Sequence, residues 1–176
     1  HCDTNGYRPG ILEGDPENGI ADGAAEILKA VRYQVKHGAD VIKTCATGGV
    51  LSEGDAVGVQ QYDDEELKVL VGEAHLTGRK VAAHAHGAEG IKASLRAGVD
   101  SIEHGSMTDD EAIALFKKTG AFLVPTLMAQ ESVEKLAQSG VLKGQRAEKA
   151  LFIAPLAREN IKRAIAAGVK IALGTD

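Results

Sequence analysis

The chain has 176 residues, 44% of them hydrophobic, and its 20 basic and 25 acidic side chains leave a net charge of −5. This acidic balance without a Lys/Arg cluster, with only three Tyr, three Phe and no Trp, argues against a nucleic-acid-binding surface. No apolar run approaches the ~20 residues that span a bilayer, and two cysteines, Cys2 and Cys45, are too few for a disulfide framework.

A repeated unit runs from Asp22 to Asp176, in which an amphipathic helix is followed by a glycine and then by a short apolar run. The glycines are Gly38, Gly78, Gly98, Gly120 and Gly168, in the joints 37–43, 77–84, 97–104, 119–125 and 167–176. Glycine enters the left-handed conformation cheaply, so each one predicts the end of a helix. Each following run is too short for a helix and apolar on both faces, which is typical of a buried parallel strand.

The helix starts and faces can also be predicted. Asp63 with Glu66, and Thr108 with Glu111, have the spacing of capping boxes. Apolar stripes at helical spacing are formed by Ile27, Leu28, Val31 and Val35, and by Leu67, Leu70, Val71 and Ala74. The stretch 126–168 is too long for one helix and contains Pro155, so two helices or one kinked helix are expected there.

Five strands that alternate with helices predict an α/β fold, with a parallel sheet and right-handed crossovers. No domain boundary is visible in the sequence. Two long polar stretches, 5–21 and 46–62, are expected to be functional loops.

The two ends of the sequence favour a fragment of a longer chain. The first residues, HCDTNGYRPG, contain neither an initiator Met nor a signal-peptide pattern, and the last, VKIALGTD, are strand-like up to a final acid. A complete domain seldom stops at a buried strand, because that edge then lacks its cover. The alternative is a short protein complete in itself. A cytoplasmic location is the expectation.

The ends of four predicted strands carry polar side chains that can bind metal ions: Lys43, His84, His104 and Asp176. Parallel α/β sheets bind ligands at the carboxyl ends of their strands. A single histidine there is more often a satisfied core residue, but four such side chains favour a metal site, because imidazole and carboxylate are ligands of Zn²⁺. In a closed barrel these strand ends would converge on one small volume.

Lys43 can be explained in two ways. It could form an ordinary salt bridge with Asp40 or Glu103. Alternatively, burial would favour the neutral amine, which can capture CO₂ as a carbamate, an anion with two oxygens that can bridge two cations.

Four segments resemble the amidohydrolase superfamily: VIKTCATGG, VAAHAHGAEGI, GVDSIEHG and IALGTD. More narrowly, they resemble its imidazolonepropionase-related dipeptidase branch, which includes metal-dependent prolidases, Xaa-Arg-type carboxypeptidases and ochratoxin-hydrolysing amidases. The resemblance covers nearly the whole chain as strands four to eight of a (β/α)₈ TIM-type barrel. It implies that residues 1–176 are the C-terminal part of a single hydrolase barrel that lacks strands one to three and anything after Asp176.

The resemblance also implies the roles of individual residues. Lys43 would be carboxylated and would bridge two divalent metal ions, with zinc the first expectation. His84 and His104 would bind the second metal, and Asp176 would bind the first and act as general base and then general acid. His86 follows His84 by one pleat and would polarise a substrate carbonyl. Family members also supply an HxH pair from their first strand, whereas His84-Ala85-His86 is an HxH that lies on the fifth strand. This chain alone is therefore expected to be inactive.

The implied reaction is hydrolysis of an amide bond in a dipeptide or an N-acyl amino acid by a hydroxide that two metal ions activate. Two alternatives stay open. One is a mononuclear deaminase or cyclic-amide hydrolase of the same superfamily, and the other is a non-catalytic α/β scaffold. The expected partner is a small-molecule or dipeptide substrate, without nucleic acid or membrane, and the full-length protein is expected to form a homo-oligomer.

Overall fold

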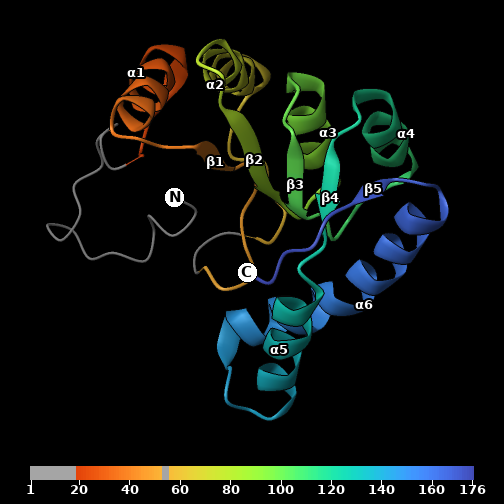
Figure 1. Ribbon diagram of the computed structural model, residues 1–176. Coiled ribbons are helices and arrows are strands. Elements are labelled where there is room, and N and C mark those ends of the chain that lie inside the picture. Colours follow the sequence, from red (N-terminus) through yellow and green to blue (C-terminus); the bar gives the residue numbers. More distant parts are fainter. Residues whose placement is uncertain (1–18, 53–55) are drawn as a thin grey trace, which may run out of the picture.

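The computed structural model describes residues 19–52 and 56–176. Most of the predicted loop 5–21, and residues 53–55 of the loop 46–62, lie outside the described residues. Within them, helices and strands alternate along the chain (Figure 1). The helices are α1 (Gly23–Lys36), α2 (Asp64–Leu76), α3 (Ala88–Ala97), α4 (Asp110–Thr119), α5 (Leu127–Gln138) and α6 (Gly144–Ala166). The strands are β1 (Val41–Cys45), β2 (Lys80–Ala85), β3 (Ser101–His104), β4 (Phe122–Val124) and β5 (Lys170–Ile171).

The helix signals in the sequence correspond to local structure. All five predicted stop glycines have positive φ angles, between 72° and 96°. Asp63 forms the complete capping box with Glu66. The capping box predicted at Thr108 is wrong, because Asp109 caps α4 by accepting a hydrogen bond from the amide of Ala112. The Thr108 hydroxyl instead donates to the carbonyl of Gly105, 2.6 Å away.

The strands form one parallel sheet in the sequential order β1-β2-β3-β4-β5. This arrangement confirms the predicted α/β class. Helices α1 to α4 cover one face of the sheet (Figure 1). On β2 the residues facing these helices are buried and alternate with less buried ones.

The expectation that the strands are buried on both faces is wrong for the described residues. Val41, Phe122 and Ile171 keep 50%, 44% and 39% of their surface exposed. The reason is that the helices cover only one of the two faces.

Residues 126–168 form two helices, and Pro155 lies inside the second of them. Helices α5 and α6 pack against each other beyond the C-terminal ends of the strands (Figure 1). They therefore stand beside the edge of the sheet where the predicted site residues lie.

Candidate functional site

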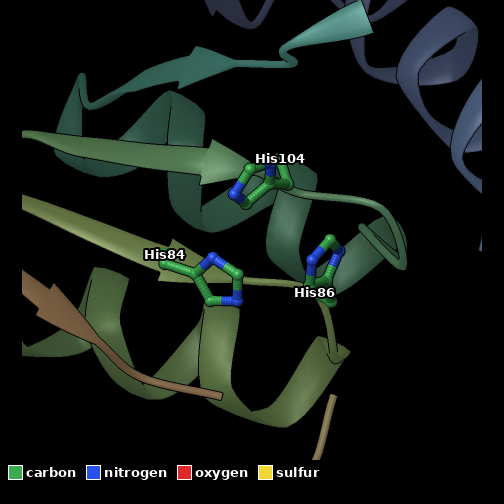
Figure 2. A group of neighbouring side chains, drawn as sticks. All are labelled: His84, His86 and His104. Atoms are coloured by element: carbon green, nitrogen blue, oxygen red, sulfur yellow. The ribbon is translucent and has the colours of Figure 1, made fainter. Parts of the chain in front are cut away.

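Three histidines meet at the C-terminal ends of β2 and β3. One ring nitrogen of each of His84, His86 and His104 lies within 4.8 Å of those of the other two. The ring centroids are 4.6 to 4.8 Å apart, with His86 and His104 stacked and His84 edge-on to both (Figure 2). Three such closely spaced imidazoles are a donor set suited to a divalent cation.

The alternation of β2 sets the direction of His84. Its neighbours Ala83 and Ala85 are fully buried, so His84 projects from the opposite face. Two residues further on, the backbone N–H of His86 donates to the hydroxyl of buried Thr47, 2.9 Å away. His84 and His86 therefore belong to one cluster although β2 ends between them.

His104 reaches the cluster through an unusual backbone conformation. Its Cα is paired with that of Ala85, so regular alternation would turn its side chain toward the helices. Instead, its φ angle of 71° lies in the left-handed region, which residues other than glycine rarely occupy. This turn at the end of β3 brings the imidazole beside His84.

Two hydroxyl groups orient the buried rings. Nδ1 of His104 is 2.7 Å from the hydroxyl of Thr126, and Nδ1 of His86 is 2.8 Å from that of Ser106. Each hydrogen bond occupies one ring nitrogen and leaves Nε2 for a ligand.

Electrostatics keep two of these rings neutral at neutral pH. Burial lowers the pKa of His86 well below its ordinary value, and His104 and His84 lower it further. Burial and the nearby Lys43 ammonium lower the pKa of His104 to about 4. A neutral imidazole keeps the lone pair that a metal ion needs. The residues present therefore fit a divalent cation.

Lys43 lies on β1, next to β2, and lines the same cavity as the histidines. Its side chain is exposed, and it is the third residue of β1 rather than the last. The carboxylate of Glu103, one partner considered for it, instead accepts a hydrogen bond from Ser101, 2.7 Å away. Burial of Lys43 is therefore not a feature of the described structure.

Asp176 also lines this cavity. It lies beyond the short strand β5 rather than at its end, because β5 ends at Ile171 and, in the described residues, only the amide of Ala172 continues the bonding, to the carbonyl of Leu123. Gly174 lets the backbone pass against Val124, with which an added Cβ would clash. Asp176 itself is exposed and has a left-handed φ angle of 66°.

The loop after β1 forms another wall of the site. Thr47 pairs with Gln60 in an antiparallel bridge, so the loop folds back on itself. Gly49 lies against His84, since a Cβ there would be 3.4 Å from the imidazole Nε2. Buried Lys149 of α6 donates to the carbonyls of Gly49 (3.3 Å) and Ser52 (2.9 Å). The loop thus connects the histidines with α6, and the cavity between them measures about 300 Å³.

Sequence reasoning missed the hydroxyl residues that support the histidines, namely Thr47, Ser106 and Thr126. A hydroxyl shortly after a strand is a common feature of loops, so the sequence carries no signal that would have singled these residues out.

In the described part of the chain, none of the helices has the length and apolar character needed to cross a bilayer.

Several known proteins are similar to this chain. The chain is 42% identical over 172 residues to an ochratoxinase of Aspergillus niger, an alignment covering 96% of this chain and 35% of the ochratoxinase. The crystal structure of A. niger ochratoxinase matches with a TM-score of 0.80 and 40% identity, over 97% of this chain and 38% of that one. A Xaa-Pro dipeptidase with methionine bound in its active site matches with a TM-score of 0.92 and 40% identity, over 98% of this chain and 43% of that one.

The chain therefore spans less than half the length of these relatives. A family model described as the amidohydrolase family matches residues 4–176, and the chain belongs to that family.

Proposed function

We propose that the protein containing this chain hydrolyses the amide bond of a dipeptide or an N-acyl amino acid, using divalent metal ions. The observation that carries the proposal is the cluster of His84, His86 and His104 in one cavity at the strand ends. The names of the relatives support the same reaction class, because ochratoxinase and a Xaa-Pro dipeptidase are among them.

The proposed metal centre has two cations, with zinc the first candidate. His84 and His104 would hold one, Asp176 the other, and a carbamate on Lys43 would bridge both. When bound, such cations polarise a carbonyl and lower the pKa of a coordinated water. The chain itself would supply strands four to eight of a barrel, and the remaining ligands would come from elsewhere in the protein.

Two side chains of this chain would handle substrate and protons. If Ser106 donates its hydrogen bond to Nδ1 of His86, the neutral ring carries its proton on Nε2 and can donate to the scissile carbonyl oxygen. Asp176 would accept a proton from the attacking water and pass it to the leaving amine. The exposure of Asp176 at the cavity is compatible with this transfer.

The first test is removal of the metal from the intact protein. Hydrolysis of a panel of dipeptides and N-acyl amino acids is measured before chelation, after chelation, and after zinc is added back. We expect chelation to abolish hydrolysis and zinc to restore it. Undiminished hydrolysis by a chelated protein without residual metal would contradict the metal mechanism, and absence of hydrolysis from the metal-loaded protein would contradict the function.

The second test addresses Lys43. Lys43→Ala is expected to lower both the metal content and hydrolysis, and a short carboxylic acid should restore part of each by replacing the carbamate. Lys80→Ala is the matched control, because Lys80 stands at the opposite end of β2 and pairs with Asp100. Full metal content in Lys43→Ala would exclude the bridging role. A ratio of one rather than two metal ions per chain in the intact protein would favour the mononuclear alternative.

A further inference from the structure

One side of the cavity beside the histidines is apolar. It is lined by side chains from α5, from α6 and from the loop after β1, namely Val50, Leu51, Ala129, Val133, Ala150 and Ile153. In the described residues, the charged side chains lining this cavity are Lys43 and Asp176. Lys43 lies close enough to His104 for its charge to lower the pKa of that ring.

The apolar side is formed by residues that are held in place. Ala150 and Ile153 are 1% and 3% exposed. Lys149, next to Ala150, directs its ammonium to the carbonyls of Gly49 and Ser52, so its charge is engaged with the loop. The side-chain amide of Gln130 donates to the carbonyl of Pro125, 2.8 Å away. The polar groups of Lys149 and Gln130 thus have protein partners, and the cavity surface between them is apolar.

The size of the cavity matches a small ligand. Its volume of about 300 Å³ is at the lower end of the range for small-molecule sites. If the scissile carbonyl of a substrate lies at the histidines, the side chain next to that carbonyl lies only a few atoms away from them. That side chain would meet the apolar residues of α5 and α6.

We propose that α5, α6 and residues 50–51 form a recognition pocket for an apolar side chain of the substrate, of the size of leucine, methionine or phenylalanine. This inference rests on the proposed amide hydrolysis and names the substrate class. Burial of an apolar side chain against these residues is favourable, whereas a charged side chain placed against the same apolar residues would lose its hydration.

The test separates binding from turnover. Free leucine, methionine, phenylalanine, glutamate and lysine are titrated calorimetrically into the intact, metal-loaded protein. Hydrolysis of dipeptides with the same side chains is measured in parallel. We expect the three apolar amino acids to bind at least ~10-fold more tightly than glutamate or lysine, and kcat/KM to follow the same order.

Two variants examine the pocket itself. Val133→Glu is expected to weaken leucine binding roughly 10-fold and to strengthen lysine binding, because it places a carboxylate in the apolar side. Leu136→Glu is the matched control, since Leu136 lies on α5, is 44% exposed and does not line the cavity. Ala129→Leu is expected to exclude phenylalanine, while free alanine, titrated in the same way, still binds.

The outcomes distinguish the two proposals. If apolar amino acids bind more tightly but no compound is hydrolysed, the proposed function is overturned and the proposed recognition pocket is still supported. Hydrolysis with equal binding of charged and apolar amino acids would overturn the pocket, as would an identical response of Val133→Glu and Leu136→Glu. Thermal unfolding and metal content show whether a variant has folded. If Val133→Glu fails to fold, the binding of phenylalanine to Ala129→Leu tests the pocket instead.

Discussion

His104 and Thr126 are hydrogen-bonded to each other, and both have backbone conformations that are rare for their residue types. Their φ angles are 71° and 45°, in the left-handed region. Such conformations cost on the order of 1–3 kcal/mol each and persist only where the surroundings enforce them. Here the conformation of His104 turns its ring toward His84, and the hydroxyl of Thr126 holds the ring there. Backbone strain therefore serves the candidate metal centre.

Thr126→Val tests this arrangement, because it keeps the β-branched shape and removes only the hydroxyl. We expect metal affinity, measured by competition with a chelator, to fall by about 10–100-fold, the usual cost of losing the hydrogen-bond partner of a metal-binding histidine. The control is Thr119→Val, whose hydroxyl bonds the carbonyl of Leu115 at the end of α4. Equal metal affinities in the two variants would show that Thr126 does not orient His104.

At the scale of elements, helix α3 and the loop after β1 fit together closely. An added Cβ on Gly90 of α3 would clash with the methyl group of Thr47. The hydroxyl of the same threonine accepts the backbone N–H of His86. The close packing of α3 is thus coupled to the position of a site residue.

Substitution of glycine by alanine in two helices measures this close approach. Gly90→Ala is expected to destabilise the protein by about 1–3 kcal/mol, because overpacking outweighs the gain in helix propensity. Gly72→Ala in α2 is expected to stabilise it by about 0.5–1 kcal/mol, since an added Cβ there contacts nothing within 4 Å. The free energy of unfolding in urea provides both values. A stabilising Gly90→Ala would contradict the described packing.

Asp100 precedes β3 and contacts α2 and β2 at the N-terminal ends of the strands, away from the histidines. Burial raises the pKa of this carboxyl, but hydrogen bonds from Lys80, His75 and the amide of Val81 outweigh that effect and hold the pKa below its ordinary value. A lowered carboxyl pKa stabilises the folded state above the unfolded pKa of about 3.9, and the contribution is lost as pH falls through the folded value.

We therefore expect Asp100→Asn to lower the free energy of unfolding by about 1 kcal/mol at pH 7. The difference from the wild type should shrink as the pH falls below 4, because the wild-type carboxyl then becomes protonated. Urea unfolding at a series of pH values measures it, with Asp40→Asn, at an exposed position, as the control. A difference that is independent of pH would mean that the charge of Asp100 contributes nothing.

For the whole molecule, the sequence contains more information about the fold than about the site. The glycine joints and the apolar runs predict the order and type of the elements, because those signals are local. The turn of the His104 side chain cannot be predicted, since it depends on a backbone conformation that strand alternation argues against. The apolar run 169–173 predicts a longer strand than β5, which ends at Ile171 although the amide of Ala172 still donates to the carbonyl of Leu123.

The histidine cluster could be predicted only in part. The strand-end rule predicts that His84 and His104 lie close together, since β2 and β3 are neighbours in a parallel sheet. The position of His86 in the cluster depends on its hydrogen bonds with Thr47 and Ser106, which are 39 and 20 positions away in the sequence. Pairings at that separation have no signature in a single sequence.

The central claim is that these histidines form a metal centre in which His84 is a ligand and His86 serves the substrate. The most direct measurement is the metal content of the intact protein by elemental analysis, for His84→Asn and His86→Asn, with His37→Asn at the exposed end of α1 as the control. We predict that His84→Asn loses metal, whereas His86→Asn keeps it and hydrolyses ~10²–10⁴-fold more slowly. Full metal content in His84→Asn, or loss of metal in His86→Asn alone, would contradict the account.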